Sequence, residues 1–159
     1  MDKKSAYLLT IKETYPDLDV LSARLHNSDG QFNDVLVIND NLIFRFPRYE
    51  ESVRDFLQEI EILQKLQGHV SLPIPNPVYI SSGTRTVGEV FMGYKMLSGE
   101  PLFRDVLNAI TDESILDTLA QQLADFLYEL HHISSVTLGL ALPIPDQFTE
   151  SKKFLSNIQ

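Results

Sequence analysis

A cation and an anion fourteen residues apart are the side chains of this sequence best suited to chemistry. Arg45 lies in the strand-like segment 42–46, and Glu59 lies in the helix-like segment 50–67 that follows it. A strand cation held by a carboxylate on the next helix is a working part of nucleotide sites, where phosphoryl transfer depends on positioning and charge neutralisation. The pair therefore indicates a kinase-like arrangement.

Strand alternation and helical spacing predict that Arg45 and Glu59 meet. Alternation places Arg45 on the strand face that also carries Ile43. Glu61 has Lys65 one helical turn later, whereas Glu59 has no cation at that spacing and borders the apolar stripe of its helix. We predict that Arg45 supplies the missing partner. The alternatives are an arginine on a solvated strand face and an exposed glutamate without a partner.

A turn and a histidine pair are weaker candidates. The turn 28–34 contains Gly30 and Asn33, and its backbone N–H groups could surround phosphates; the alternative is an ordinary hairpin turn. His131 and His132 close a long helix, where donor side chains commonly meet unpaired carbonyl groups. We interpret them as helix-terminal residues rather than as a catalytic base or metal ligands.

Composition excludes several classes of function. The net charge is −9, and the 13 Lys and Arg form no basic cluster, which argues against a nucleic-acid partner. The chain has no cysteine and no HExxH motif, so disulfides and Cys-based zinc sites are excluded and metal ligation by the protein alone is not expected. No apolar run reaches the ~18 residues of a membrane span. We expect a cytoplasmic protein.

Hydrophobic periodicity predicts sheet elements first and helices afterwards, an α+β order. A five-stranded antiparallel sheet with a packed helix should precede an incomplete helical region. The hinge between them is expected at residues 95–99, which divides the chain into regions 1–94 and 100–159. The expected elements are helices at 2–14, 50–67 and 112–131, the last with Thr111 as N-cap, and strands at 20–26, 34–38, 42–46, 78–81 and 89–97.

The order of these elements resembles the N-terminal lobe of the aminoglycoside phosphotransferase family, a branch of the protein-kinase-like fold, and is most similar to the 2''-phosphotransferases. The resemblance covers roughly residues 18–135, and the motifs in order are more specific than any one of them. The motifs are Gly30 with Asn33-Asp34, Phe44-Arg45-Phe46-Pro47-Arg48, Glu59-Ile60-Glu61-Ile62-Leu63, Leu72-Pro73-Ile74-Pro75-Asn76-Pro77, the segment 93–102 and the segment 123–131.

The resemblance implies a nucleotide site with a role for each matching residue. Arg45 would contact the phosphates, Glu59 would anchor it, and Ile43 would pack against the base. The backbone groups of Lys95 and Leu97 would read the edge of the purine, and Gly30 and Asn33 would belong to the phosphate loop. The strand cation is Arg where many family members have Lys, and a planar fork binds phosphate differently from a compact ammonium group.

The catalytic machinery of such enzymes has no match here. The family resembles kinases in needing a catalytic Asp in a His-x-Asp motif and further ligands for Mg²⁺, and no His-x-Asp occurs in the sequence. Asp125-Phe126-Leu127 is similar to a metal-binding motif, but its spacing is typical of a helix. We therefore expect no catalytic residue and no metal site in this chain, which would be inactive alone.

The sequence thus predicts the nucleotide-binding portion of a truncated aminoglycoside-type kinase. The parent would use ATP or GTP with Mg²⁺, would phosphorylate a hydroxyl of its substrate, and would confer antibiotic resistance. One alternative is a related kinase for a macrolide, a choline-like amine or a sugar. The other is a binding domain without catalysis. Apolar helix positions after residue 99 also predict a possible homo-oligomer.

Overall fold

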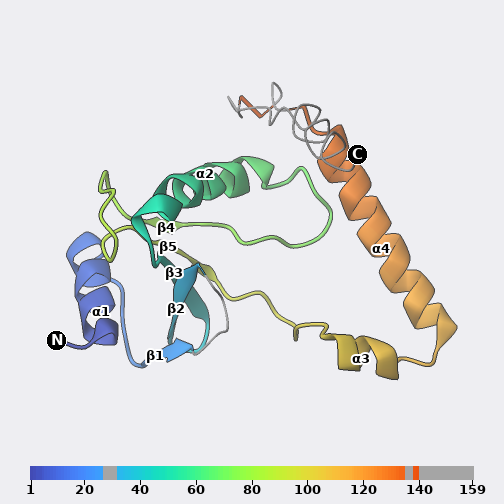
Figure 1. Cartoon of the computed structure of the whole chain (residues 1–159), viewed down its shortest axis with the longest axis horizontal. Helices are drawn as coiled ribbons and strands as arrows, with labels where there is room; N and C mark the ends of the chain where they lie inside the picture. The colour runs from blue at the N-terminus through green and yellow to red at the C-terminus, as the bar shows by residue number, and fades with distance from the viewer. Residues whose placement is uncertain (27–31, 135–137, 140–159) are drawn as a thin grey trace, which may run out of the picture.

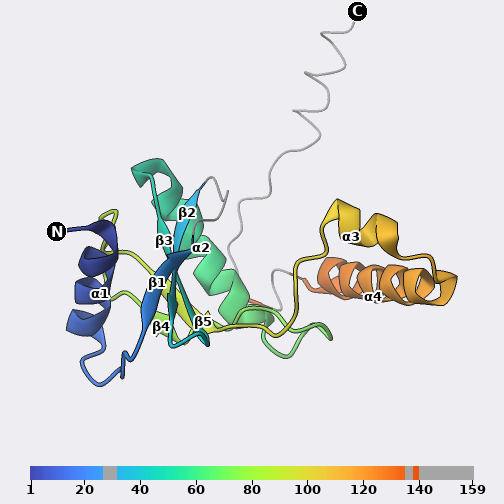
Figure 2. The same cartoon turned by 90° about the horizontal axis from the view of Figure 1, so that it is seen from below.

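A five-stranded antiparallel sheet lies between two helices in the N-terminal part of the chain (Figures 1 and 2). The computed structural model describes residues 1–26, 32–134 and 138–139. The strand order is β1-β2-β3-β5-β4, which confirms the predicted sheet. The elements are α1 (Lys3–Thr14), β1 (Ala23–His26), β2 (Asn33–Ile38), β3 (Leu42–Pro47), α2 (Glu50–Leu66), β4 (Tyr79–Ile80), β5 (Met92–Lys95), α3 (Arg104–Ala109) and α4 (Glu113–His132).

The last two strands are shorter than the sequence predicts. β4 holds only two residues, and β5 begins at Met92 rather than at residue 89. The amides of Glu89 and Val90 both donate to the carbonyl of Thr86, so this segment closes a turn instead of extending the ladder. β1 likewise starts three residues later than predicted, at Ala23.

One face of the sheet packs against α1 through aromatic side chains. The ring of Tyr7 stacks on Phe46 with centroids 3.9 Å apart. Gly93 makes room for the Phe44 ring, because a Cβ at this position would lie 2.5 Å from the Phe44 Cε1 atom. This core is built from Tyr7, Ile11, Leu36, Ile38, Phe44, Phe46 and Phe91. It fixes β3, the strand that carries Arg45, at the centre of the sheet.

The opposite face packs against α2, whose apolar residues recur at helical spacing. The helix buries Val53, Phe56 and Ile60. These side chains pack against Met92 in β5 and against Val90 in the turn that precedes β5. Because strand residues alternate between faces, Arg45 points to this side while its neighbours Phe44 and Phe46 fill the α1 core. The prediction for the two faces of β3 is therefore confirmed.

The end of α1 reaches the free edge of β4. The Tyr15 hydroxyl accepts a hydrogen bond from the Ile80 amide at 2.8 Å and donates one to the Ile80 carbonyl at 3.0 Å. The amide of Ser81 faces the other way, since it donates to the Phe91 carbonyl. One tyrosine thus satisfies both outward-facing backbone groups of Ile80.

Two further helices, α3 and α4, follow the sheet and bury none of their residues (Figure 1). Asp112 is the N-cap of α4, because its carboxylate accepts from the Ser114 amide at 2.9 Å; the prediction of Thr111 was wrong by one residue. His132 bonds the Tyr128 carbonyl at 2.8 Å, which fits a helix-terminal role. No helix within the described residues has the length and apolar character needed to cross a membrane.

Candidate functional site

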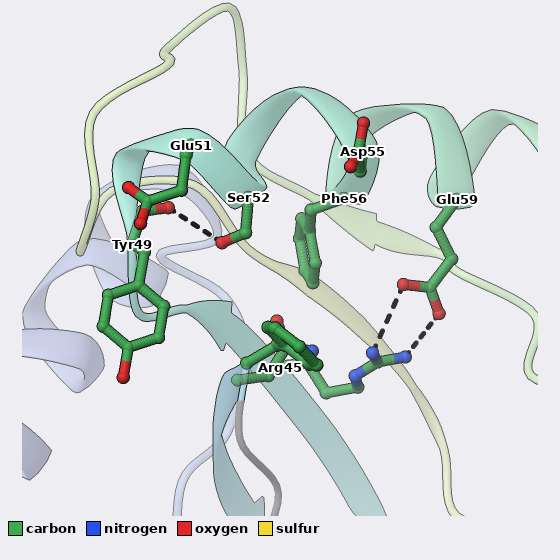
Figure 3. Close-up of a pocket in the computed structure, with 9 residues that line it drawn as sticks. Arg45, Tyr49, Glu51, Ser52, Asp55, Phe56 and Glu59 are labelled. Atoms are coloured by element: carbon green, nitrogen blue, oxygen red, sulfur yellow. Dashed lines mark hydrogen bonds and ion pairs between the residues drawn. The ribbon is translucent and has the colours of Figure 1, made fainter. Parts of the chain in front are cut away.

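Arg45 and Glu59 form a two-pronged ion pair between β3 and α2 (Figure 3). The Arg45 Nη1 atom lies 2.6 Å from Glu59 Oε1, and Nη2 lies 3.2 Å from Oε2. The Arg45 side chain is 21% exposed and that of Glu59 is 39% exposed. Two parallel hydrogen bonds fix the plane of the guanidinium as well as its position. The predicted pairing is therefore confirmed.

Two aromatic side chains border the guanidinium of Arg45. Its Cζ atom lies 5.8 Å from the centre of the Phe56 ring, within the range of a cation–π contact. Burial raises the pKa of the Tyr94 hydroxyl, and the nearby positive charge of Arg45 opposes that rise. The cation is thus held by a carboxylate and lies in partly apolar surroundings, where its charge is less screened than in bulk water.

A pocket of ≈ 560 Å³ opens beside this ion pair, between the first turns of α2 and the ends of β2 and β3. Figure 3 shows Phe56 and Glu59 pointing from α2 toward Arg45. The lining contains one guanidinium and three carboxylates, so the pocket is net acidic. Its lining residues are Phe32, Asn33, Arg45, Tyr49, Glu51, Ser52, Asp55, Phe56 and Glu59.

A buried carboxylate supports one rim of the pocket. Asp34 is 9% exposed, and it accepts hydrogen bonds from the Tyr7 hydroxyl at 2.7 Å, Lys3 Nζ at 2.9 Å and Arg48 Nε at 2.8 Å. Burial alone would raise the pKa of Asp34, but these three donors outweigh it and leave the pKa lowered. Burial and the same carboxylate raise the pKa of Tyr7.

Sequence reasoning missed this role of Asp34 and most of the pocket lining. A signal for Asp34 was present, because alternation along β2 places it on the same face as Leu36 and Ile38, and a carboxylate on an apolar face needs partners. The aromatic wall formed by Tyr49 and Phe56 had no such signal, since both residues fit an ordinary helix start and core.

The other predicted site residues divide into three groups. Asn33 lines the pocket together with Arg45 and Glu59. Ile43, Lys95 and Leu97 do not line it; Ile43 pairs with Tyr94 in the β3–β5 ladder, Lys95 ends β5, and Leu97 is exposed just beyond. Gly30 lies outside the described residues.

No metal site is evident in the part of the chain that the structure describes. Across residues 1–26, 32–134 and 138–139, no three His, Asp or Glu side chains are grouped so that they could hold an ion. Asp125 lies in α4 and accepts a hydrogen bond from Gln121 at 2.8 Å.

An antiparallel five-stranded sheet whose central strand presents a cation to a carboxylate on the packed helix is the N-lobe of a protein-kinase-like fold. The chain belongs to the aminoglycoside phosphotransferase family, since the model of the phosphotransferase enzyme family matches residues 22–157. No curated protein matches the chain.

Solved structures of aminoglycoside phosphotransferases are similar over nearly the whole chain. The GDP complex of wild-type aminoglycoside 2'-phosphotransferase-IIIa is 29% identical with a TM-score of 0.80, covering 98% of this chain and 51% of that one. The GDP and kanamycin complex of APH(2'')-IIIa is 28% identical with a TM-score of 0.76, covering 96% and 51%. The gentamicin complex of APH(2'')-IIa is 25% identical with a TM-score of 0.70, covering 99% and 50%. This chain spans about half the length of these structures.

Proposed function

We propose that this chain is the nucleotide-binding portion of a kinase that transfers the γ-phosphoryl group of ATP or GTP to a hydroxyl of an aminoglycoside-like substrate. The observation that carries the proposal is the ion pair of Arg45 and Glu59 at the wall of the pocket. The family membership and the GDP complexes among similar structures support it. The proposed parent would act in the cytoplasm, where it would confer antibiotic resistance.

Arg45 would serve as the phosphate contact. A guanidinium has five N–H groups, and the pair with Glu59 uses two of them. The remaining donors belong to a group whose orientation is already fixed, so binding an oxyanion costs little reorganisation. Replacing Glu59 should loosen this orientation even though the charge of Arg45 remains.

The base would bind farther along the same face of the sheet. Ile43 lies two residues before Arg45 on β3 and pairs with Tyr94, so it would offer an apolar wall to a purine. The chain leaves β5 at Lys95 and is exposed at Leu97, where backbone groups would meet the edge of the base. Gly30 and Asn33 would contribute to the phosphate loop.

The acceptor proposal is based on similar structures and on charge. Kanamycin and gentamicin are the aminoglycosides in the complexes compared above. Their amino groups are cationic at neutral pH, and the net charge of −9 would favour the approach of such molecules. The substrate itself would be bound by the parent enzyme.

The charge of the pocket sets an expectation for the 159-residue chain. Three carboxylates and one guanidinium line the pocket, so phosphate groups gain little there. Adenosine or guanosine should therefore bind weakly and about as tightly as ATP or GTP, with no dependence on Mg²⁺. No phosphotransferase turnover of kanamycin is expected.

Calorimetry and amide NMR shift mapping test this proposal. The purine nucleosides should shift the amides of Ile43, Lys95 and Leu97, and Ile43→Ala should weaken binding. Leu9→Ala, on the half-exposed outer side of α1, is the matched control and should leave binding unchanged. Failure of millimolar nucleoside to shift these amides would overturn the proposed site. A strong Mg²⁺-dependent preference for the triphosphate, or turnover of kanamycin, would show that this chain does hold catalytic or metal-binding residues.

A further inference from the structure

The rim of the pocket is connected to α1 by side chains that play no part in the proposed nucleotide contacts. Phe32 and Asn33 line the pocket and immediately precede Asp34 on β2. The Arg48 amide donates to the Phe32 carbonyl at 2.9 Å, and the Arg48 side chain donates to Asp34 Oδ1 at 2.8 Å. Arg48 therefore holds the rim twice, once through its backbone and once through Asp34.

The second oxygen of Asp34 belongs to α1. Tyr7 and Lys3 both donate to Oδ2, and the Tyr7 ring is stacked on Phe46 of β3. The aromatic core thus sets the position of Tyr7, and Tyr7 sets the position of the carboxylate. Within the described residues no buried side-chain polar atom lacks a partner, so the network is complete.

The same network reaches the strand that carries the proposed phosphate contact. Asn33 pairs with Pro47 in the β2–β3 ladder, and Asp34 pairs with Phe46. A shift of Asp34 would therefore move the ends of both strands that border the pocket. A buried carboxylate with three donors resists such a shift, because each hydrogen bond to a charged group is stronger than a neutral one.

We propose that Asp34 is a positioning residue, through which α1 fixes the Phe32–Asn33 rim of the nucleotide pocket. The proposal rests on the proposed function for the identity of the ligand. The order of the Phe32–Asn33 rim does not depend on the proposed function and can be measured without any ligand. Asp34 itself does not touch the pocket volume, since it is absent from the lining residues.

A fluorescent reporter on the rim makes the order of the rim measurable. The chain contains no Trp, and Phe32 is 62% exposed, so Phe32→Trp introduces a single indole with room to fit. In this background Asp34→Asn removes the charge with little change of shape. We expect lower anisotropy of the indole and stronger acrylamide quenching, shifted toward the values of the urea-unfolded chain. Unchanged anisotropy and quenching in a folded Asp34→Asn protein would overturn the proposal.

Milder variants keep the test decisive if Asp34→Asn does not fold. Lys3→Ala removes one donor to Asp34 from an exposed position, and Lys4→Ala is its neighbour and control. Lys3→Ala should lower the anisotropy of the indole slightly, and Lys4→Ala should leave it unchanged. Ile11→Val lowers stability through the α1 core without touching the network, so its indole signal should stay at the starting value. If Ile11→Val lowered the anisotropy of the indole as much as Asp34→Asn does, the role of Asp34 would be purely structural.

Nucleoside titration separates this inference from the proposed function. If the rim loosens and nucleoside affinity falls in Asp34→Asn, both hold. If the rim loosens in a chain that binds no nucleoside at all, the positioning role stands and the proposed function fails. If nucleosides bind equally well with a loosened rim, the positioning role stands for the phosphate end of the pocket and does not extend to the base site at Ile43.

Discussion

The two longest helices within the described residues share an amphipathic sequence pattern but differ in what surrounds them. α2 and α4 are both amphipathic, yet α2 buries Val53, Phe56, Ile60 and Leu66 while α4 buries no residue. In α4, Leu116, Leu123 and Leu127 are 36%, 56% and 40% exposed, and Leu119, Phe126 and Leu130 are only partly buried. Periodicity therefore predicts that a helix forms and which face is apolar, but it does not reveal what covers that face.

Matched leucine truncations give the largest expected difference between the two regions. Leu36→Ala opens a cavity in the α1 core and should cost about 2–5 kcal/mol in the free energy of unfolding. Leu123→Ala removes a side chain that is 56% exposed and should change stability by less than about 0.5 kcal/mol. Urea denaturation of both variants measures this difference. Equal losses of stability would mean that α4 is covered in solution, as it would be in a homo-oligomer.

Acidification should weaken the sheet region through Asp34. Its pKa is lowered in the folded chain, so its contribution to stability is present above the unfolded pKa of about 3.9 and is lost as pH falls through the folded pKa. Asp34→Asn should cost about 1.5–3 kcal/mol near neutral pH, because it weakens hydrogen bonds to a buried charge. The difference in urea midpoint between Asp34→Asn and wild type, measured from pH 6 to 2.5, should narrow below pH 4. Asp40 forms an exposed ion pair with Arg24, so Asp40→Asn should not lower the urea midpoint to a comparable extent.

The ion pair between the sheet and α2 should contribute less. Glu59→Gln leaves the partly buried Arg45 without its anion and should cost about 1–2 kcal/mol. Glu61→Gln breaks the exposed pair with Lys65 on the same helix and should cost about 0.3–0.5 kcal/mol. A double-mutant cycle with Arg45→Met isolates the coupling energy. A coupling energy near zero would make the pair irrelevant to the fold, and its role would then lie in binding alone.

The N-cap of α4 should have a local effect only. Asp112→Ala removes the N-cap and should cost about 1 kcal/mol in local helix stability. Amide hydrogen exchange should quicken in the first turns of α4 and stay unchanged in β3. Thr111→Ala is the control, since the sequence alone favoured Thr111 as the cap. If Thr111→Ala accelerates exchange and Asp112→Ala does not, the helix begins one residue earlier than the structure shows.

Local patterns predicted the framework of the fold and the central pair of the site. Alternation along β3 and the lack of a helical partner for Glu59 were sufficient to place Arg45 against it, since both rules act within a few residues. The Asp34 network was not predicted, because no local rule indicates that Tyr7 and Arg48 meet Asp34, and only packing brings them together. The turn at Thr86 was missed for a related reason, as its apolar residues suit a strand equally well.

The contact between Tyr15 and Ile80 has a consequence for how the chain behaves at high concentration. β4 is an edge strand, and an edge with free N–H and C=O groups is a template on which another chain can add a strand. The Tyr15 hydroxyl occupies both outward-facing groups of Ile80, so the edge is closed at this residue. On its β4 side the sheet is thereby protected from edge-to-edge pairing by a single phenol from the end of the first helix.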